Sequence, residues 1–324
     1  MNLRLTACDD DRVWDDFVER SLQGSVFCQS AFMAALGKPV ERWLLSEDEW
    51  VVAAYPVLMN GIGAPAAAPH AYTLYQGLMF HSDIDLEAPH RGVQHKLKLT
   101  DFLLEELSLR YSRISLCTHP QLDDIRSFLW FNYHRAEKGV FQAHTRYTGL
   151  LSLENFDQQS YLSQVRSLRK REFARATRDG YRVVESTDVA ALDRLHELTF
   201  ARQGLTRSPS EVALLRSITE GALKQGFGQC MTAVNGAGEI ASANLILFDK
   251  RTAYYLIGAN HPDFRSSGAS TYLMCAAIER AASMGLKHFD FVGVNSPDRG
   301  DYKLSFNARP VLYHTLDWQK PSDS

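Results

Sequence analysis

Six consecutive residues, from Arg265 to Ser270, have the side chains that a phosphate-binding loop needs. They stand between an aromatic and β-branched run, Tyr254–Ala259, and an alanine-rich segment whose apolar residues recur at helical spacing. This order predicts a strand, a loop and a helix whose first turn presents unpaired N–H groups at the positive end of its dipole. Small side chains let a phosphate approach those N–H groups, and an arginine adds a charge-assisted contact. The pattern favours either a pyrophosphate cradle or an ordinary strand–loop–helix, and the candidate cradle residues are Arg265, Ser266, Ser267, Gly268, Ala269 and Ser270.

A second candidate for anion binding is the basic stretch from Arg166 to Arg182. It holds seven basic and two acidic residues, whereas the net charge of the whole chain is −3. Arg171, Arg175 and Arg178 lie three and four residues apart, so a helix places them on one face. This face is either a solvated helix surface or a clamp for a phosphate-rich ligand such as a coenzyme A tail, a nucleotide sugar or a tRNA acceptor stem.

The loop and the segments after it resemble a known family. Arg265, Gly268 and Ser270 fill the Arg/Gln-x-x-Gly-x-Gly/Ala pattern of the acyl-CoA-binding segment of the GNAT superfamily, with serine at the final small position. The segments 290–293 and 302–306 are similar to the FemAB and CelD-like (BioF-type) branch, whose members carry two GNAT-like domains in tandem. The resemblance implies a mixed α/β (α+β) fold in which each domain has a twisted, largely antiparallel sheet flanked by helices.

The resemblance also implies roles for particular residues. Tyr302 matches the tyrosine that returns a proton to the departing thiolate, and Lys303 matches a lysine that holds a phosphate of the acceptor or donor. A backbone N–H of the strand around Ile257 is the expected donor to the oxyanion. Asp290, at the end of the next strand, either deprotonates the attacking amine or caps a turn. The alternatives are packing for Tyr302 and a surface charge for Lys303.

Helices alternate with strands along the whole chain, which favours an α/β layer fold. We expect two domains, an N-terminal domain on the acceptor side over residues 1–152 and a C-terminal domain with the donor-binding loop over residues 153–324. In the first domain the aromatic segment Tyr72–Phe80 predicts a strand, and its aromatic side chains predict either core packing or an acceptor cleft.

Bulk composition excludes several classes of protein. The chain has 324 residues, 45% of them hydrophobic and 23% charged, as expected for globular domains. No apolar run approaches the roughly 18 residues of a membrane span, and the acidic N-terminus lacks an apolar signal core. The five cysteines are scattered, without the spacing of a metal site or a disulfide framework. We therefore expect a cytoplasmic protein without a metal, while the oligomeric state stays open.

Three functions are consistent with these patterns. The first is an N-acyltransferase that transfers an acyl group from acyl-CoA to a small-molecule, sugar or peptidoglycan-type amine by direct attack. The second keeps the fold but takes its acyl group from aminoacyl-tRNA, as FemAB-type aminoacyltransferases do, which would make tRNA a partner. The third is a module that binds a ligand without turnover.

Overall fold

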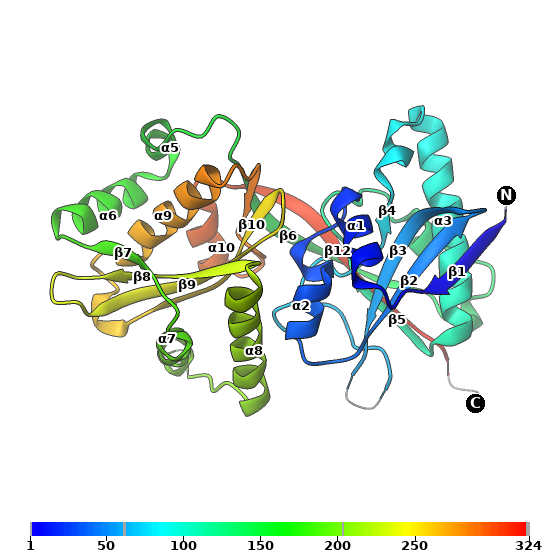
Figure 1. The fold of residues 1–324 in the computed structure, drawn as a ribbon, viewed down its shortest axis with the longest axis horizontal. Helices are drawn as coiled ribbons and strands as arrows, with labels where there is room; N and C mark the ends of the chain where they lie inside the picture. The colour runs from blue at the N-terminus through cyan, green and yellow to red at the C-terminus, as the bar shows by residue number, and fades with distance from the viewer. Residues whose placement is uncertain (1, 61–62, 203, 322–324) are drawn as a thin grey trace. The chain divides into compact units, whose positions relative to one another are not determined.

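The computed structural model describes residues 2–60, 63–202 and 204–321, and the chain divides into two compact units (Figure 1). The first unit comprises residues 1–146 and 312–324, and the second comprises residues 147–311. We expected a single boundary near residue 152 and a second domain that ran to the C-terminus. The last strand instead joins the first unit, because residues Thr315–Gln319 pair with Arg113–Cys117.

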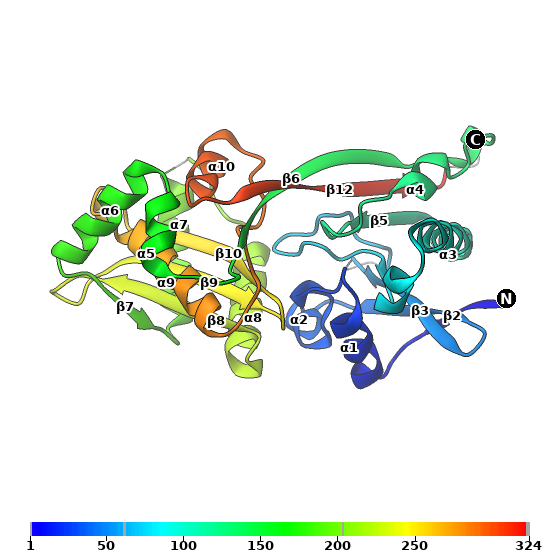
Figure 2. The same ribbon diagram turned by 90° about the horizontal axis from the view of Figure 1, so that it is seen from above.

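The first unit contains a four-stranded antiparallel sheet in the order β1-β2-β3-β4, and its β5 pairs with the C-terminal strand β12. Its elements are β1 (Leu3–Ala7), α1 (Asp11–Arg20), η1 (Val26–Cys28), α2 (Ser30–Ala35), β2 (Val40–Glu47), β3 (Trp50–Leu58), β4 (Met79–Phe80), η2 (Ser82–Leu86), α3 (Pro89–Arg110), β5 (Arg113–Cys117), α4 (Arg126–Trp130) and η3 (Ala136–Lys138). Helices α1 and α2 cover one face of β2 and β3, and α3 covers the other face (Figure 2).

The expected strand Tyr72–Phe80 is wrong for most of its length. Only Met79 and Phe80 pair with β3, and the preceding segment is irregular. Tyr72 and Tyr75 adopt φ values of 59° and 55°, in the left-handed region that a strand excludes. Tyr75 is 1% exposed and packs edge-on against neighbouring rings, so its aromatic character serves core packing.

The strands of the second unit follow the order β6-β11-β10-β9-β8-β7 across their sheet. Its elements are β6 (Gln142–Ser152), α5 (Gln158–Gln164), α6 (Ser167–Arg178), β7 (Arg182–Glu185), α7 (Val189–Ala201), α8 (Pro209–Gln225), β8 (Gly228–Val234), β9 (Ile240–Phe248), β10 (Thr252–Asn260), η4 (Pro262–Phe264), α9 (Ala269–Ser283), β11 (His288–Asp290), α10 (Pro297–Leu304) and β12 (Arg309–Gln319), of which β6 and β12 have residues in both units. In Figure 1, α5, α6 and α9 lie on one side of strands β7–β10, and α7 and α8 lie on the other.

Both faces of this sheet are covered by helices. Strands β8 and β9 are buried almost throughout, as expected for strands packed between two helical layers. Met231 and Ile246 belong to the core that α9 completes with Leu273 and Ile278. The pairs β6–β11, β9–β10, β8–β9 and β7–β8 are antiparallel, and β10–β11 is parallel. The predicted class, an α/β fold with largely antiparallel sheets flanked by helices, is therefore confirmed.

Candidate functional site

Strands β10 and β11 separate at the centre of the second unit. They pair in parallel over only three positions, the last of which joins Tyr254 to Asp290. Beyond that point β10 continues to Asn260, paired with β9 alone, and its register shifts between Tyr255 and Ile257. In the described part of the chain, no strand pairs with the edge of β10 that β11 leaves, and such an edge can offer main-chain N–H and C=O groups to a ligand. Ile257, whose N–H we expected at an oxyanion, lies in this part of the strand.

The predicted loop and helix follow directly on β10. Gly268 is the N-cap of α9, with φ of 88° and no side chain to cap the first turn. Ser267 accepts a hydrogen bond from the Ala269 N–H at 3.1 Å and donates to the Phe264 carbonyl at 2.6 Å. Arg265 and Ser266 are exposed, and Ala269 is buried. The geometry therefore combines a helix N-terminus with an adjacent arginine and an exposed serine, as the cradle hypothesis requires.

Gly268 also has a structural role that the sequence did not indicate. A Cβ at this position would lie 2.3 Å from the Glu172 carbonyl oxygen in α6. Because the contact is with backbone and φ is positive, every other residue type is strained here. Valine at this position would therefore strain the fold, and glycine lets α6 and α9 pack closely.

A buried polar network joins α6 to α9 beside this glycine. Arg169 is 8% exposed, forms an ion pair with Glu172 at 2.7 Å and donates to the Thr271 hydroxyl at 3.0 Å. Thr271 in turn donates to Glu172 at 2.5 Å. The Arg169 guanidinium also lies 4.9 Å from the centre of the Tyr302 ring. Sequence reasoning missed Arg169 and singled out other arginines of the same helix.

The three arginines that we did single out lie away from this network on α6. Arg171 and Arg178 are exposed, and Arg175 is partly buried, with no hydrogen-bond partner for its Nε among the described residues. Arg178 is 74% exposed at its side chain and pairs with Asp179 at 3.1 Å. The inner face of the helix belongs to Arg169 and the residues packed against α9, so the basic outer face remains open to solvent.

Asp290, the candidate base, is 2% exposed and sits in a turn at the end of β11. It accepts hydrogen bonds from the Thr148 hydroxyl at 2.5 Å and from the Val292 N–H at 2.7 Å. Val292 has φ of 53°, which is rare for a β-branched residue, and Gly293 follows with φ of 69°. Of the two roles that we left open for Asp290, these contacts favour the turn, since the carboxylate holds a strained backbone in place.

This turn aims two carbonyl groups at Lys303. The Lys303 ammonium donates to the Val292 carbonyl at 2.6 Å and to the Gly293 carbonyl at 2.9 Å. Burial lowers the pKa of Lys303 to about 8, and the nearby Asp290 carboxylate opposes that shift. The ammonium also lies 5.9 Å from the centre of the Tyr255 ring. Lys303 is therefore neither an exposed surface charge nor free to reach a distant phosphate.

Tyr302 projects from the same helix into the core of the unit. Its ring packs edge-on against Phe306 at 5.1 Å, and its hydroxyl oxygen is buried without a hydrogen-bond partner of good geometry among the described residues. Burial raises the pKa of Tyr302 to about 12, although the Ser270 hydroxyl and the Arg169 guanidinium act in the opposite direction. A phenol with this pKa keeps its proton at neutral pH, so it is able to act as an acid.

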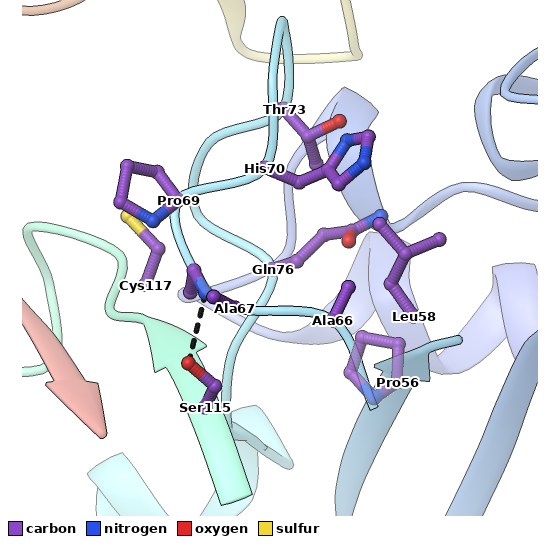
Figure 3. A pocket seen from close by; sticks show the side chains of 11 residues that line it. Pro56, Leu58, Ala66, Ala67, Pro69, His70, Thr73, Gln76, Ser115 and Cys117 are labelled. Carbon is purple, nitrogen blue, oxygen red and sulfur yellow. Dashed lines mark hydrogen bonds between the residues drawn. The ribbon is translucent and has the colours of Figure 1, made fainter. Parts of the chain in front are cut away.

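The first unit has a small cavity (Figure 3), and the described residues that line it form no comparable group of catalytic side chains. The volume of this cavity is about 20 Å³, which is room for a single water molecule. It lies among Pro56, His70, Gln76 and Ser115, where the Ser115 hydroxyl accepts a hydrogen bond from the Ala68 N–H at 2.8 Å. A broader groove of about 1040 Å³ runs past Trp130 and Tyr133.

Within residues 2–60, 63–202 and 204–321, no helix is both long enough and apolar enough to span a bilayer. No three His, Cys, Asp or Glu side chains in the same ranges converge as ligands for a metal ion.

Residues 163–304 match the family model described as "Acetyltransferase (GNAT) domain". The match begins just before α6 and ends in α10, so it includes the separating strands, the loop before α9, Tyr302 and Lys303. No protein among the curated sequences matches the chain.

Solved structures are similar to the chain over nearly its whole length. A crystal structure of FemX has a TM-score of 0.70 at 13% identity, covering 97% of each chain. A tandem GNAT protein from the clavulanic acid biosynthesis pathway has a TM-score of 0.55 at 14% identity, covering 99% of this chain and 100% of that one. L-PGS from Bacillus licheniformis has a TM-score of 0.53 at 11% identity, covering 97% and 92%. The likeness establishes a tandem GNAT fold, which together with the family match supports an acyltransferase.

Proposed function

We propose that the protein is an N-acyltransferase that moves an acyl group from acyl-CoA to the amine of a small-molecule or sugar/peptidoglycan-type acceptor. The observation that carries the proposal is the separation of β10 from β11 directly before the N-terminus of α9. An acyl-thioester lying along the free edge of β10 would bring its phosphates to the loop Arg265–Ser270. The family match over residues 163–304 supports this interpretation.

The proposed chemistry is a direct displacement. The amine nitrogen attacks the thioester carbonyl, and the new C–N bond gives a tetrahedral intermediate whose oxyanion accepts a hydrogen bond from the β10 backbone near Ile257. The C–S bond then breaks, and the leaving thiolate takes a proton from Tyr302. The amine gives up its surplus proton to water or to neutral Lys303, which is present in quantity above about pH 8. Asp290 positions the carbonyl groups that hold Lys303 and does not contact the amine.

A second donor class has specific support. The likeness to FemX covers 97% of the chain, and the exposed outer face of α6 has the arginines that a nucleic-acid backbone would need. Aminoacyl-tRNA would use the same carbonyl chemistry, with a ribose hydroxyl as the leaving group in place of a thiol. We rank it second because the loop before α9 combines a glycine N-cap with an exposed arginine and an exposed serine, features that favour a pyrophosphate.

One experiment separates the two donors. The purified protein is offered acetyl-CoA or a glycylated tRNA acceptor-stem minihelix with a panel of primary amines, and amide products are identified by mass spectrometry. Amide formation from acetyl-CoA with release of free thiol supports the first proposal. Amide formation only from the minihelix replaces it with the second, and binding of either probe without any product contradicts both.

A further inference from the structure

Asn244 is a poorly satisfied polar side chain in the core of the second unit. It is 1% exposed, and neither its Oδ1 nor its Nδ2 has a hydrogen-bond partner among the described residues. A buried carboxamide left in this state destabilises the folded protein, and nearly all buried polar groups in proteins are paired. An apolar residue of the same size would avoid this penalty, so the carboxamide calls for another explanation.

The side chain lies on the face of the sheet that carries the proposed donor site. Asn244 pairs with Met231 on one side and with Gly258 on the other, and residues opposite each other in a sheet share a face. Met231 belongs to the core that α9 completes, so Asn244 lies on the α9 face of the sheet. Its partner Gly258 is in the part of β10 that β11 leaves, next to Ile257.

A phenol hydroxyl lies beside this carboxamide. A Cβ built on Gly258 would come within 1.5 Å of the Tyr255 hydroxyl, so this phenol is folded over the glycine. Cβ atoms of opposed residues are about 4.5–5.5 Å apart, which places the Tyr255 hydroxyl next to the Asn244 side chain. In the described part of the chain, no hydrogen bond joins the two. Tyr302 is close enough to Tyr255 to raise its pKa further, beyond the effect of burial.

From this arrangement we infer that Asn244 selects the acyl group of the donor, and that this acyl group carries a neutral hydroxyl or amide close to its carbonyl. The inference rests on the proposed function and specifies its substrate class. A carboxamide offers an acceptor oxygen and a donor nitrogen, which a hydroxyl or an amide satisfies together. A plain alkyl chain leaves both atoms of Asn244 unpaired, and a site built for a polar group rejects such an analogue.

The test compares two acyl groups of nearly equal size. Glycolyl-CoA and propionyl-CoA differ by a hydroxyl in place of a methyl, and both carry the same pantetheine amides. We expect the native protein to bind or turn over the glycolyl thioester at least about fivefold better, the lower limit for leaving a buried polar group unpaired. Asn244→Leu, which is close in size, should reduce this preference to about one, and Asn244→Ala should do the same without filling the space.

Thermal unfolding of the ligand-free protein gives a readout that does not depend on the donor. Asn244→Leu should raise the Tm by about 2 °C or more, because it removes an unpaired buried carboxamide. Ser242→Ala is the matched control on the same strand, because the Ser242 hydroxyl donates to the Ala259 carbonyl at 3.1 Å and to Asn260 Oδ1 at 2.7 Å. This control should lower the Tm and leave the ratio of glycolyl to propionyl unchanged.

The outcomes distinguish this inference from the proposed function. A fall in Tm for Asn244→Leu shows that the carboxamide is a structural group and overturns the inference, whatever the donor is. If Asn244→Leu weakens binding or turnover of both thioesters equally, Asn244 contacts the pantetheine arm that they share, and the inference is also overturned. If neither thioester binds the native protein, the acyl-CoA proposal fails. The glycolyl and propionyl groups are then offered as amides of 3′-amino-3′-deoxyadenosine. If the ratio of glycolyl to propionyl binding is the same in Asn244→Leu as in the native protein, the inference is overturned.

Discussion

Tyr302 is the residue at which catalysis and packing are most easily told apart. Its hydroxyl is buried without a hydrogen-bond partner of good geometry among the described residues, so Tyr302→Phe removes little that stabilises the fold. We expect the free energy of unfolding to stay the same or to rise, while turnover falls about a hundredfold to ten-thousandfold, as loss of a general acid implies. Urea denaturation and single-turnover kinetics measure the two effects. If Tyr302→Phe turns over at the rate of the native protein, Tyr302 is not the general acid, and solvent supplies the proton.

Lys303 gives a prediction about pH. Its pKa in the folded protein is about 8, below the usual 10.5, so between these values the unfolded chain binds more protons than the folded one. The unfavourable burial of the ammonium is therefore fully present below pH 8 and is relieved as the pH rises toward 10.5. Relative to Lys303→Met, the native protein should gain stability on the order of 2 kcal/mol between pH 7 and pH 9.5.

Urea denaturation of both proteins at pH 7 and at pH 9.5 measures this difference. Tyr255 and Asp290, which lie near the ammonium, are retained in the variant, so the comparison isolates the lysine. If the stability difference between the two proteins is the same at both pH values, the ammonium is hydrated and its pKa is not lowered.

The individual site residues were predictable only in part. Gly268 and Tyr302 follow from local pattern and family resemblance, because each lies at a fixed place in the order of strand, loop and helix. Arg169 was not predictable, since on a basic helix every arginine looks alike until the face covered by α9 is known. The partners of Lys303 were also hidden, because they depend on left-handed backbone at Val292 that no propensity indicates.

At the scale of elements, the packing of α6 against α9 holds the loop before α9 in place. Gly268→Ala would force a Cβ toward the Glu172 carbonyl oxygen, 2.3 Å away, at a positive φ. We expect a loss of stability of roughly 2–4 kcal/mol, the combined effect of overpacking and backbone strain. Gly285→Ala is the matched control at the other end of α9, where φ is 78° and nothing among the described residues lies within 4 Å of the added Cβ.

Gly285→Ala should lower the free energy of unfolding by only about 1 kcal/mol, because it has the strain of a positive φ without the steric clash with a neighbouring backbone. Thermal or urea denaturation of the two variants compares these losses directly. Equal losses would mean that α6 moves aside at little cost, and that the glycine at 268 is required only by its backbone conformation.

The elements themselves were predicted well where periodicity is strong. The helix α9 and the strand β10 lie close to the segments expected from the sequence, because apolar residues recur there at helical or strand spacing. The prediction of a strand over Tyr72–Phe80 was wrong, because aromatic residues also fill irregular buried loops. The left-handed backbone at Tyr72 and Tyr75 prevents strand pairing there. The return of β12 to the first unit depends on long-range pairing with β5, which a single sequence does not encode locally.

At the scale of the whole molecule, charge is distributed unevenly. The net charge is −3, yet the stretch from Arg166 to Arg182 has five more basic than acidic residues, so the rest of the chain is more acidic than the total suggests. Arg171, Arg175 and Arg178 on α6 contribute to this excess, and a local excess of positive charge attracts an anionic ligand that the molecule as a whole would repel weakly. The strength of this attraction should depend on salt, because Arg171 and Arg178 are exposed.

The last prediction uses that dependence to weigh the two donors. Replacing Arg171, Arg175 and Arg178 by glutamine should weaken binding of a phosphate-rich ligand and reduce the slope of log affinity against log salt concentration. For an RNA minihelix, the magnitude of this slope should fall by about 0.7–0.9 for each phosphate that the variant no longer neutralises. Loss of three arginines should therefore reduce it by about two. For coenzyme A, with few phosphates, the slope is small from the start and changes by less than about one. Arg194→Gln, which replaces an exposed arginine on α7, is the control. Identical slopes in the native and triple-variant proteins, for both ligands, would leave the outer face of α6 as a solvated surface without a role in binding.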